Sequence, residues 1–223
     1  MRMALERLVE SPSFIGFTQA LIVINAVALG IEAMPAVGEP YEAALGWLFS
    51  ASTAWFVVEI GLRFAATGGH VRRFFANGWN SFDFAIVMLS LIPLAGGVAI
   101  VARLLRLLRL LRLVSGLSLL RGFVAGTLTW TAHLGAGLLL LALSIYMFAL
   151  AGFHLAGGVL AELPQWSTLG PAITSVMAWL LPFAPPPLPA EGLQGQTFLV
   201  MLALAHIAWL ALLARGFFAR KTP

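Results

Sequence analysis

The chain has 223 residues, of which 61% are hydrophobic and only 10% are charged, and its formal net charge is +4. A soluble globular domain carries about 25% charged residues, so this composition excludes a soluble enzyme and indicates a membrane protein that crosses the bilayer several times. The chain has no cysteine, which excludes disulfides and cysteine-ligated metal sites. We find no catalytic set, phosphate loop or metal cluster, and we therefore expect no enzyme activity, no metal and no cofactor.

Six apolar stretches follow one another along the chain and are predicted to span the membrane. A transmembrane helix needs about 20 predominantly apolar residues, and most of these stretches have that length. A short amphipathic segment, residues 1–13, precedes the first of them. The predicted spans are residues 14–34, 43–67, 82–94, 98–114, 130–155 and 197–218.

Two further segments lie between these spans. Residues 115–129 are less apolar, and we expect a linker helix along the membrane face. Residues 171–181 are apolar but too short to cross a bilayer. The prolines of residues 182–195 prevent a regular helix from continuing. The short helix is therefore predicted to enter the membrane only part of the way.

The charges of the loops predict the topology. Six spans place both termini on one side, and the basic loop residues fall on that side. This positive-inside pattern predicts cytoplasmic termini in a multi-pass protein of the inner (plasma) membrane. The basic residues are Arg2, Arg7, Arg72, Arg73, Arg121, Arg215, Arg220 and Lys221, and the acids of the opposite loops are Glu39, Glu42, Glu162 and Glu191.

The order of the segments predicts an all-α membrane protein with a four-helix bundle (residues 1–114), a linker helix (115–129) and a two-helix module with a re-entrant helix (130–223). A re-entrant segment is tolerated only where it is buried in protein or lines a water-filled cavity. Two spans and one half-helix cannot enclose a pore alone. We therefore expect a homotetramer in the lipid bilayer.

The fourth predicted span carries four arginines at three-residue spacing, separated by Leu-Leu pairs: Arg103, Arg106, Arg109 and Arg112. On an insertion scale these charges leave the segment roughly 7–10 kcal/mol short of entering the membrane alone. The segment therefore needs carboxylate partners on other helices, or it lies on the membrane surface.

The spacing favours the first alternative. Steps of three spread the arginines around an α-helix, whereas in a 3₁₀-helix they would form one row. A stepped row of charges suits a helix that slides past fixed acids, which is the geometry of a voltage sensor. The alternative is a basic face that binds anionic lipid or nucleic acid. Because the basic residues cluster here and at loop ends, we expect no nucleic-acid partner.

The chain resembles the bacterial voltage-gated sodium channels, within the voltage-gated cation channel superfamily. The resemblance covers about half of the chain and combines motifs of all four spans of the bundle. The segments that carry it are residues 8–11, 21–25 and 29–32 in the first span, 56–63 in the second, 79–84 in the third and 103–114 in the fourth.

This resemblance implies roles for residues at matching positions. The four arginines of the fourth span would be gating charges. The rest of the sensor would comprise the counter-charges Glu59 and Asp83, the outer polar contacts Asn25 and Glu32, and the hydrophobic plug Phe56. Buried acids need partners, and these arginines are the nearest unpaired cations. Three alternatives stay open: Glu59 pairs locally with Arg63, Asp83 is an end-of-span carboxylate that faces water or caps the helix, and Phe56 is ordinary packing.

The pore departs from the resemblance. Residues 178–185 contain no acid, Ser or Thr, whereas the family's filter carries a glutamate, and the ungapped register places Phe183 there. A selective filter replaces an ion's hydration with carbonyls or carboxylates, and only backbone carbonyls remain here. The predicted filter region is Trp179, Leu180, Leu181, Pro182 and Phe183.

Three functions follow from these patterns. The first is a voltage-gated cation channel subunit of the sodium type, passing monovalent cations. The second is a non-conducting, voltage-responsive membrane subunit with a degenerate pore. The third is a proton pathway through the sensor bundle alone. We favour the first because the sensor, linker and pore layout are all retained.

Overall fold

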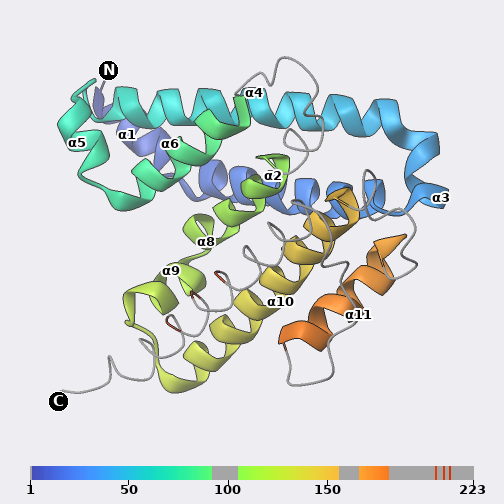
Figure 1. Ribbon diagram of the computed structural model, residues 1–223. Helices are drawn as coiled ribbons and strands as arrows, with labels where there is room; N and C mark the ends of the chain where they lie inside the picture. The colour runs from blue at the N-terminus through green and yellow to red at the C-terminus, as the bar shows by residue number, and fades with distance from the viewer. Residues whose placement is uncertain are drawn as a thin grey trace. The chain divides into compact units, whose positions relative to one another are not determined.

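The computed structural model describes residues 2–91, 105–155 and 166–180, together with residues 204, 208 and 211. The chain divides into two compact units. Unit 1 comprises Met1–Glu32 with Ala36–Leu117, and unit 2 comprises Ala33–Pro35 with Ser118–Pro223. All regular elements of the described residues are helices (Figure 1).

Unit 1 contains the predicted first to fourth spans. Its two long helices, α2 and α4, pack against each other, and α6 packs against α4. The elements of this unit are α1 (Arg2–Val9), α2 (Pro12–Glu32), α3 (Pro35–Gly38), η1 (Glu39–Tyr41), α4 (Glu42–Ala66), α5 (Val71–Phe75), α6 (Gly78–Leu91), η2 (Leu108–Leu111) and α8 (Arg112–Gly116).

Local signals explain where these helices begin and end. The hydroxyl of Ser11 accepts a hydrogen bond from the Phe14 amide, and Pro12 occupies the first turn of α2, where its missing N–H costs nothing. Helix α4 ends at Ala66, and Gly68, two residues beyond, has a φ of 75°, the left-handed conformation that closes a helix. The side chain of Asn77 accepts a hydrogen bond from the Trp79 amide, and α6 therefore begins at Gly78 rather than at residue 82.

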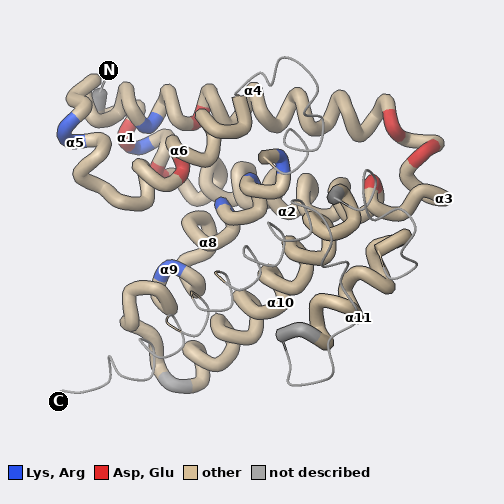
Figure 2. Tube along the Cα trace, viewed as in Figure 1, with Lys and Arg blue, Asp and Glu red and all other residues tan. Residues whose placement is uncertain are grey.

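The charges at the two ends of α4 have opposite signs. Glu42 lies in its first turn and Glu39 on η1 just before it, whereas Arg72 and Arg73 lie on α5, beyond its last turn (Figure 2). Helix α4 has 25 residues and is about 37 Å long at 1.5 Å per residue, which exceeds the hydrocarbon thickness of about 30 Å. This separation of charge agrees with a helix that crosses a bilayer.

The hydrophobic core of unit 1 is built by side chains from α2, α4, α5 and α6. Its buried members are Ile22, Phe56, Ile60, Phe74 and Val87. Phe74 packs edge-on against Phe64 and Phe84, so that α5 is held onto α4 and α6. This core fixes the positions of the helices from which the acids of the site project.

Unit 2 contains α9 (Ser118–Ala125), α10 (Trp130–Leu155) and α11 (Leu169–Leu180). Helix α10 packs against both of the others. The ring of His133 stacks on Phe123 at 4.4 Å between centroids, which joins α9 to α10. Gly152 faces the indole of Trp166, and a Cβ at this position would overlap the ring.

The described residues contain three helical stretches long and apolar enough to cross a membrane: Pro12–Glu32, Pro35–Ala66 and Thr131–His154. The length and composition of these helices therefore identify the chain as a multi-pass membrane protein. The predicted fourth span is described only from residue 105, and the predicted sixth span lies outside the described residues except for single positions. Within residues 115–129, predicted as a linker helix, the structure has the end of α8 and the helix α9.

Candidate functional site

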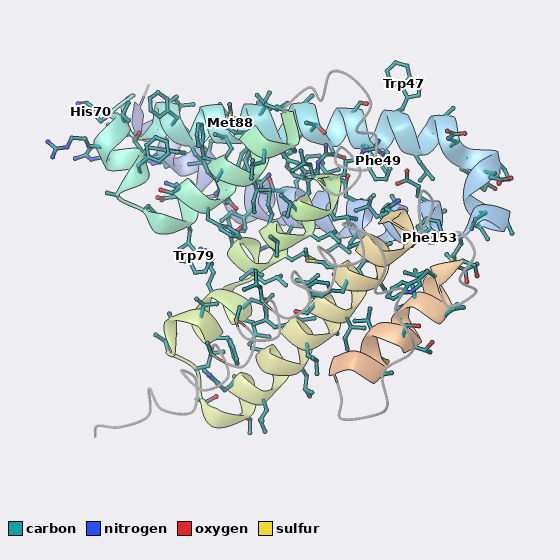
Figure 3. The ribbon with its side chains drawn as sticks, in the orientation of Figure 1. Trp47, Phe49, His70, Trp79, Met88 and Phe153 are labelled. Carbon is teal, nitrogen blue, oxygen red and sulfur yellow. The ribbon has the colours of Figure 1, made fainter. Side chains whose placement is uncertain are left out.

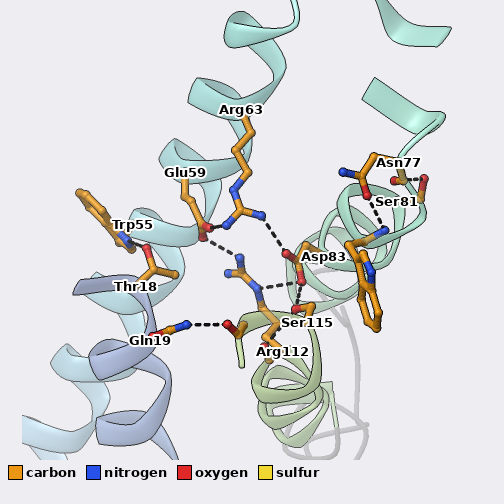
Figure 4. A network of polar contacts seen from close by, with 12 residues as sticks. Thr18, Gln19, Trp55, Glu59, Arg63, Asn77, Ser81, Asp83, Arg112 and Ser115 are labelled. Atoms are coloured by element: carbon orange, nitrogen blue, oxygen red, sulfur yellow. Dashed lines mark hydrogen bonds and ion pairs between the residues drawn. The ribbon is translucent and has the colours of Figure 1, made fainter. Parts of the chain in front are cut away.

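The last arginine of the predicted sensor lies between two buried acids. Arg112 begins α8, which packs against α2 and α6. Its NH2 donates to Glu59 Oε2 at 2.6 Å, and its Nε lies 3.6 Å from Asp83 Oδ1 (Figure 4). The side chains of Arg112 and Glu59 are 1% and 0% exposed. This burial makes the pairing obligatory, because an isolated charge in such a place would be strongly unfavourable.

A second arginine completes the cluster from α4 itself. Arg63 NH2 lies 2.6 Å from Glu59 Oε1, and its NH1 donates to Asp83 Oδ2 at 3.0 Å. Two carboxylates therefore face two guanidinium groups, and the cluster is formally neutral. Glu59 has both the local i,i+4 pair and the partner on the arginine segment, so the two alternatives raised for this acid coexist.

The hydroxyl of Ser115 adds a neutral donor to the same acid. It donates to Asp83 Oδ1 at 2.5 Å and also lies 3.0 Å from the Arg112 carbonyl oxygen. At the next residue, Gln19 Nε2 of α2 donates to the carbonyl oxygen of Gly116 (Figure 4). These contacts attach the end of α8 to α2 and α6.

Phe56 lies beside the charged cluster. The Arg112 Cζ is 4.4 Å from the centroid of the Phe56 ring, which is a close cation–π contact. Phe56 is 2% exposed and also belongs to the core of unit 1. The residue therefore packs in the core and contacts the arginine with its ring face, so that packing and the predicted plug position are compatible.

The preceding arginine has no acid beside it within the described residues. Arg109 is 7% exposed, and its NH1 donates to the carbonyl oxygen of Phe49 at 3.3 Å. Phe49 projects from the side of α4 opposite to the exposed Trp47 (Figure 3). Among the described residues this buried guanidinium thus has only a backbone carbonyl as a hydrogen-bond partner, which is a costly position for a charge.

Arg106 lies nearer the Phe49 end of the bundle. Its NH1 is 3.5 Å from Glu32 Oε1, and its Cζ is 5.9 Å from the centroid of the Phe49 ring. The side chains of this pair are 35% and 28% exposed. Arg106 and Arg109 therefore both contact Phe49, whereas Arg112 contacts Glu59, ten residues further along α4.

The backbone of the arginine segment explains why Arg109 and Arg112 face the same way. Residues 105–107 are α-helical, whereas η2 is a 3₁₀-helix with three residues per turn. In that conformation side chains three residues apart point the same way, and each step advances about 6 Å at about 2.0 Å per residue. The local 3₁₀ geometry thus turns Arg109 and Arg112 toward the same side of the bundle.

The remaining predicted site residues are placed as follows. Asn25 is buried and donates to Ser52 Oγ and to the Leu21 carbonyl oxygen, both at 2.7 Å, and it contacts no arginine of the described residues. Trp179 and Leu180 end α11, but their side chains are not described. Arg103, Leu181, Pro182 and Phe183 lie outside the described residues. The roles predicted for all of these remain predictions.

A family model described as ion transport protein matches residues 11–210, which cover most of both units. The chain belongs to the ion transport protein family. Within the residues that the structure describes, no group of three or more His, Asp or Glu side chains could hold a metal ion.

One curated relative of this ion transport protein is the voltage-dependent calcium channel type A subunit alpha-1 of Apis mellifera. The two are 37% identical over 86 residues, which make up 39% of this chain and 4% of the relative. The chain thus corresponds to a very small part of that relative's length. Because the match is local, it carries no statement about the whole relative's activity.

Two solved structures are similar over nearly the full length. NaChBac in a lipid nanodisc is 25% identical, with 96% of each chain covered and a TM-score of 0.52. A NaChBac-Nav1.7VSDII chimera in a nanodisc is 26% identical, with 95% of this chain and 96% of that chain covered and a TM-score of 0.49. Together with the family match, the first likeness confirms the voltage-gated cation channel superfamily, whereas the narrower resemblance to sodium channels stays a prediction.

Three contacts of this ion transport protein were not predicted from the sequence. A pair between Arg63 and Glu59 was one alternative raised for that acid, and Arg63 also reaches Asp83 on another helix. Ser115 continues the three-residue series of the arginines, and this spacing is a signal that could have identified it. Phe49 lies seven residues before Phe56 on α4 and so faces a similar direction, which could have indicated its contact with the arginine segment.

Proposed function

We propose that this chain is one subunit of a voltage-gated cation channel of the sodium type, in which four copies surround a central pore. In this proposal unit 1 senses the membrane potential, and residues 130–223 form the pore module with a re-entrant helix. The chain lies in the inner membrane as six spans with both termini in the cytoplasm. Family membership and the likeness to NaChBac support this assignment.

The observation that carries the proposal is the position of Arg112 between Glu59 and Asp83, while Arg109 and Arg106, at the same three-residue spacing, lie at Phe49. Arginines at a regular spacing meet one fixed pair of acids. When the segment moves by three residues, another arginine takes the place of Arg112 with the same partners. The segment can therefore move without leaving a buried charge unpaired at the acids.

The electrical energy available for this movement is large. Each elementary charge that crosses 100 mV gains about 2.3 kcal/mol, so about three charges supply roughly 7 kcal/mol in each subunit. In our proposal depolarisation drives the arginines outward, and the segment then pulls on residues 115–129 and opens the bundle of sixth spans. Phe56 separates the water on the two sides, so that the field falls over a short distance.

A second function is favoured by one feature of the sequence. Residues 178–185 contain no acid or hydroxyl side chain, and the stretch is rich in proline. An apolar constriction can close a pore by excluding water. The second candidate is therefore a non-conducting, voltage-responsive subunit that retains the same sensor.

Patch recording of the purified protein in liposomes tests both candidates. The channel predicts a cation current that grows with depolarisation, and Arg106→Gln reduces its voltage dependence. Arg72→Gln is the matched control, because it removes one exposed cation from α5 outside the arginine segment. Charge movement without ionic current identifies the second candidate, and voltage dependence that Arg106→Gln leaves unchanged contradicts the sensor assignment.

A further inference from the structure

Glu59 and Asp83, here called the acidic pair, bind one cation that does not move with the arginine segment. Arg63 belongs to the same helix as Glu59, four residues further on, so its position relative to that acid is fixed. It also donates to Asp83 at 3.0 Å. Of the two guanidinium groups at the acids, Arg112 alone is carried by the arginine segment.

The position that follows the arginines carries no charge. Ser115 continues the series of three-residue steps after Arg112, and its hydroxyl donates to Asp83 Oδ1. The described contacts of Asp83 therefore come from one fixed cation, one travelling cation and one neutral hydroxyl. The charges of the two acids and the two cations cancel.

We propose that Arg63 limits the acidic pair to one travelling arginine and that Ser115 makes the observed position the outer end of the sensor's travel. This inference rests on the proposed voltage-sensing function. It assigns to Arg63 the setting of the midpoint voltage at which the sensor charge moves. Arg63 is a positioning residue, because it acts on the sensor only through the two acids that it shares with Arg112.

The charge balance at the acids explains why the arginine segment prefers the outer position to one further inward. One inward step of three residues brings Arg109 to the place of Arg112 and brings Arg112 to the place of Ser115. Three cations then face two acids. In a poorly solvated site one uncompensated charge is strongly unfavourable, so Arg63 favours the outer position over each inner one.

Removing the fixed cation reverses this balance. In Arg63→Gln the outer position has one cation for two acids, whereas the next inward position has two. The curve of displaced charge against voltage therefore shifts to more positive voltages, and at a fixed voltage the ratio of inner to outer sensors rises by about tenfold or more. Arg63→Lys keeps the charge but loses the fork that reaches both acids, and we expect a smaller shift in the same direction.

Ser115→Arg provides the rescue, because it restores a second cation beside Asp83 at the outer position. In the Arg63→Gln background it returns the curve toward that of the parent chain. Arg72→Gln again serves as the control, since it removes a nearby cation that does not touch the acids, and it leaves the curve in place.

The experiment measures charge movement in the full-length parent and in these variants. A positive shift in Arg63→Gln that Ser115→Arg reverses supports the inference. If Arg63→Gln does not fold, the smaller positive shift of Arg63→Lys supports it and an unshifted curve overturns it. Two results overturn this inference alone, provided that the parent moves charge. The charge–voltage curve of Arg63→Gln stays in place, or Ser115→Arg in that background shifts it further in the positive direction. A parent without any voltage-driven charge movement overturns the proposed function as well.

Discussion

Arg112 lies on the face of Phe56 at 4.4 Å in the same position in which it pairs with Glu59 at 2.6 Å. The aromatic ring and the carboxylate contact different parts of one guanidinium group. A cation that is almost completely removed from solvent thus has two favourable partners at this position. Arg109 and Arg106 have weaker partners near Phe49, and this difference leads to the first two predictions.

Arg112→Gln should destabilise the folded protein far more than Arg106→Gln. Removing Arg112 leaves two buried carboxylates with Arg63 alone, which costs about 3–5 kcal/mol, whereas a partly exposed pair such as Arg106–Glu32 contributes about 0–1 kcal/mol. Thermal unfolding of both variants in nanodiscs measures the difference. Equal losses of stability would contradict the burial argument.

Arg109→Leu should stabilise the protein and at the same time reduce the charge that it moves. Within the described residues this buried guanidinium has a carbonyl partner only, so an apolar side chain avoids a desolvation penalty on the order of 1 kcal/mol or more. The melting temperature and the total displaced charge are measured on the same preparation. A lower melting temperature would show that Arg109 has a partner that offsets its burial.

Asn25 and Ser52 should behave as a coupled pair. The buried amide of Asn25 donates to the Ser52 hydroxyl at 2.7 Å and joins α2 to α4. We expect a double-mutant cycle of Asn25→Ala and Ser52→Ala to give a coupling of about 0.5–1.5 kcal/mol in unfolding. If Asn25 is also a polar contact for the arginines, Asn25→Ala shifts the charge–voltage curve and Ser52→Ala does not. Equal curves for the two variants would restrict Asn25 to a structural role.

Gly152→Ala should disrupt the packing of α10 in unit 2. A methyl group at this position overlaps the buried indole of Trp166. Gly135→Ala on the same helix is the matched control, because a Cβ there meets no atom within 4 Å. We expect a lower melting temperature for the first variant and an unchanged or slightly higher one for the second, since alanine favours a helix by about 0.5–1 kcal/mol over glycine. A neutral Gly152→Ala would contradict the packing.

Apolar patterning predicted the limits of one long helix and misplaced those of another. The predicted fifth span, residues 130–155, has the same limits as α10. The first predicted span was displaced by two residues, because the cap at Ser11 and the first-turn proline Pro12 fix the start of α2 before its apolar stretch begins. Apolar patterning finds the membrane segment, whereas capping decides where the helix starts.

The partners within the site were only partly predictable. Burial cost predicts that Glu59 and Asp83 need cations, and both contact Arg112. The sequence does not show which of four equally spaced arginines lies at the acids, because each would satisfy them equally well. It also does not choose between α- and 3₁₀-helix for η2, since this choice depends on how the segment packs against α2 and α6. The second contact of Arg63 depends on the distance between α4 and α6, which no local pattern specifies.

The most direct test of the central claim is the voltage dependence of thiol modification at one residue of the arginine segment. The chain has no cysteine, so Leu105→Cys gives a single reactive position, and Trp47→Cys on α4 gives an exposed control. Vesicles holding each variant are treated with an external, membrane-impermeant thiol reagent at inside-negative and inside-positive potentials. We predict that residue 105 reacts faster at the inside-positive potential, while residue 47 reacts at the same rate at both. Equal rates for residue 105 at the two potentials would contradict the movement of these arginines in the membrane field.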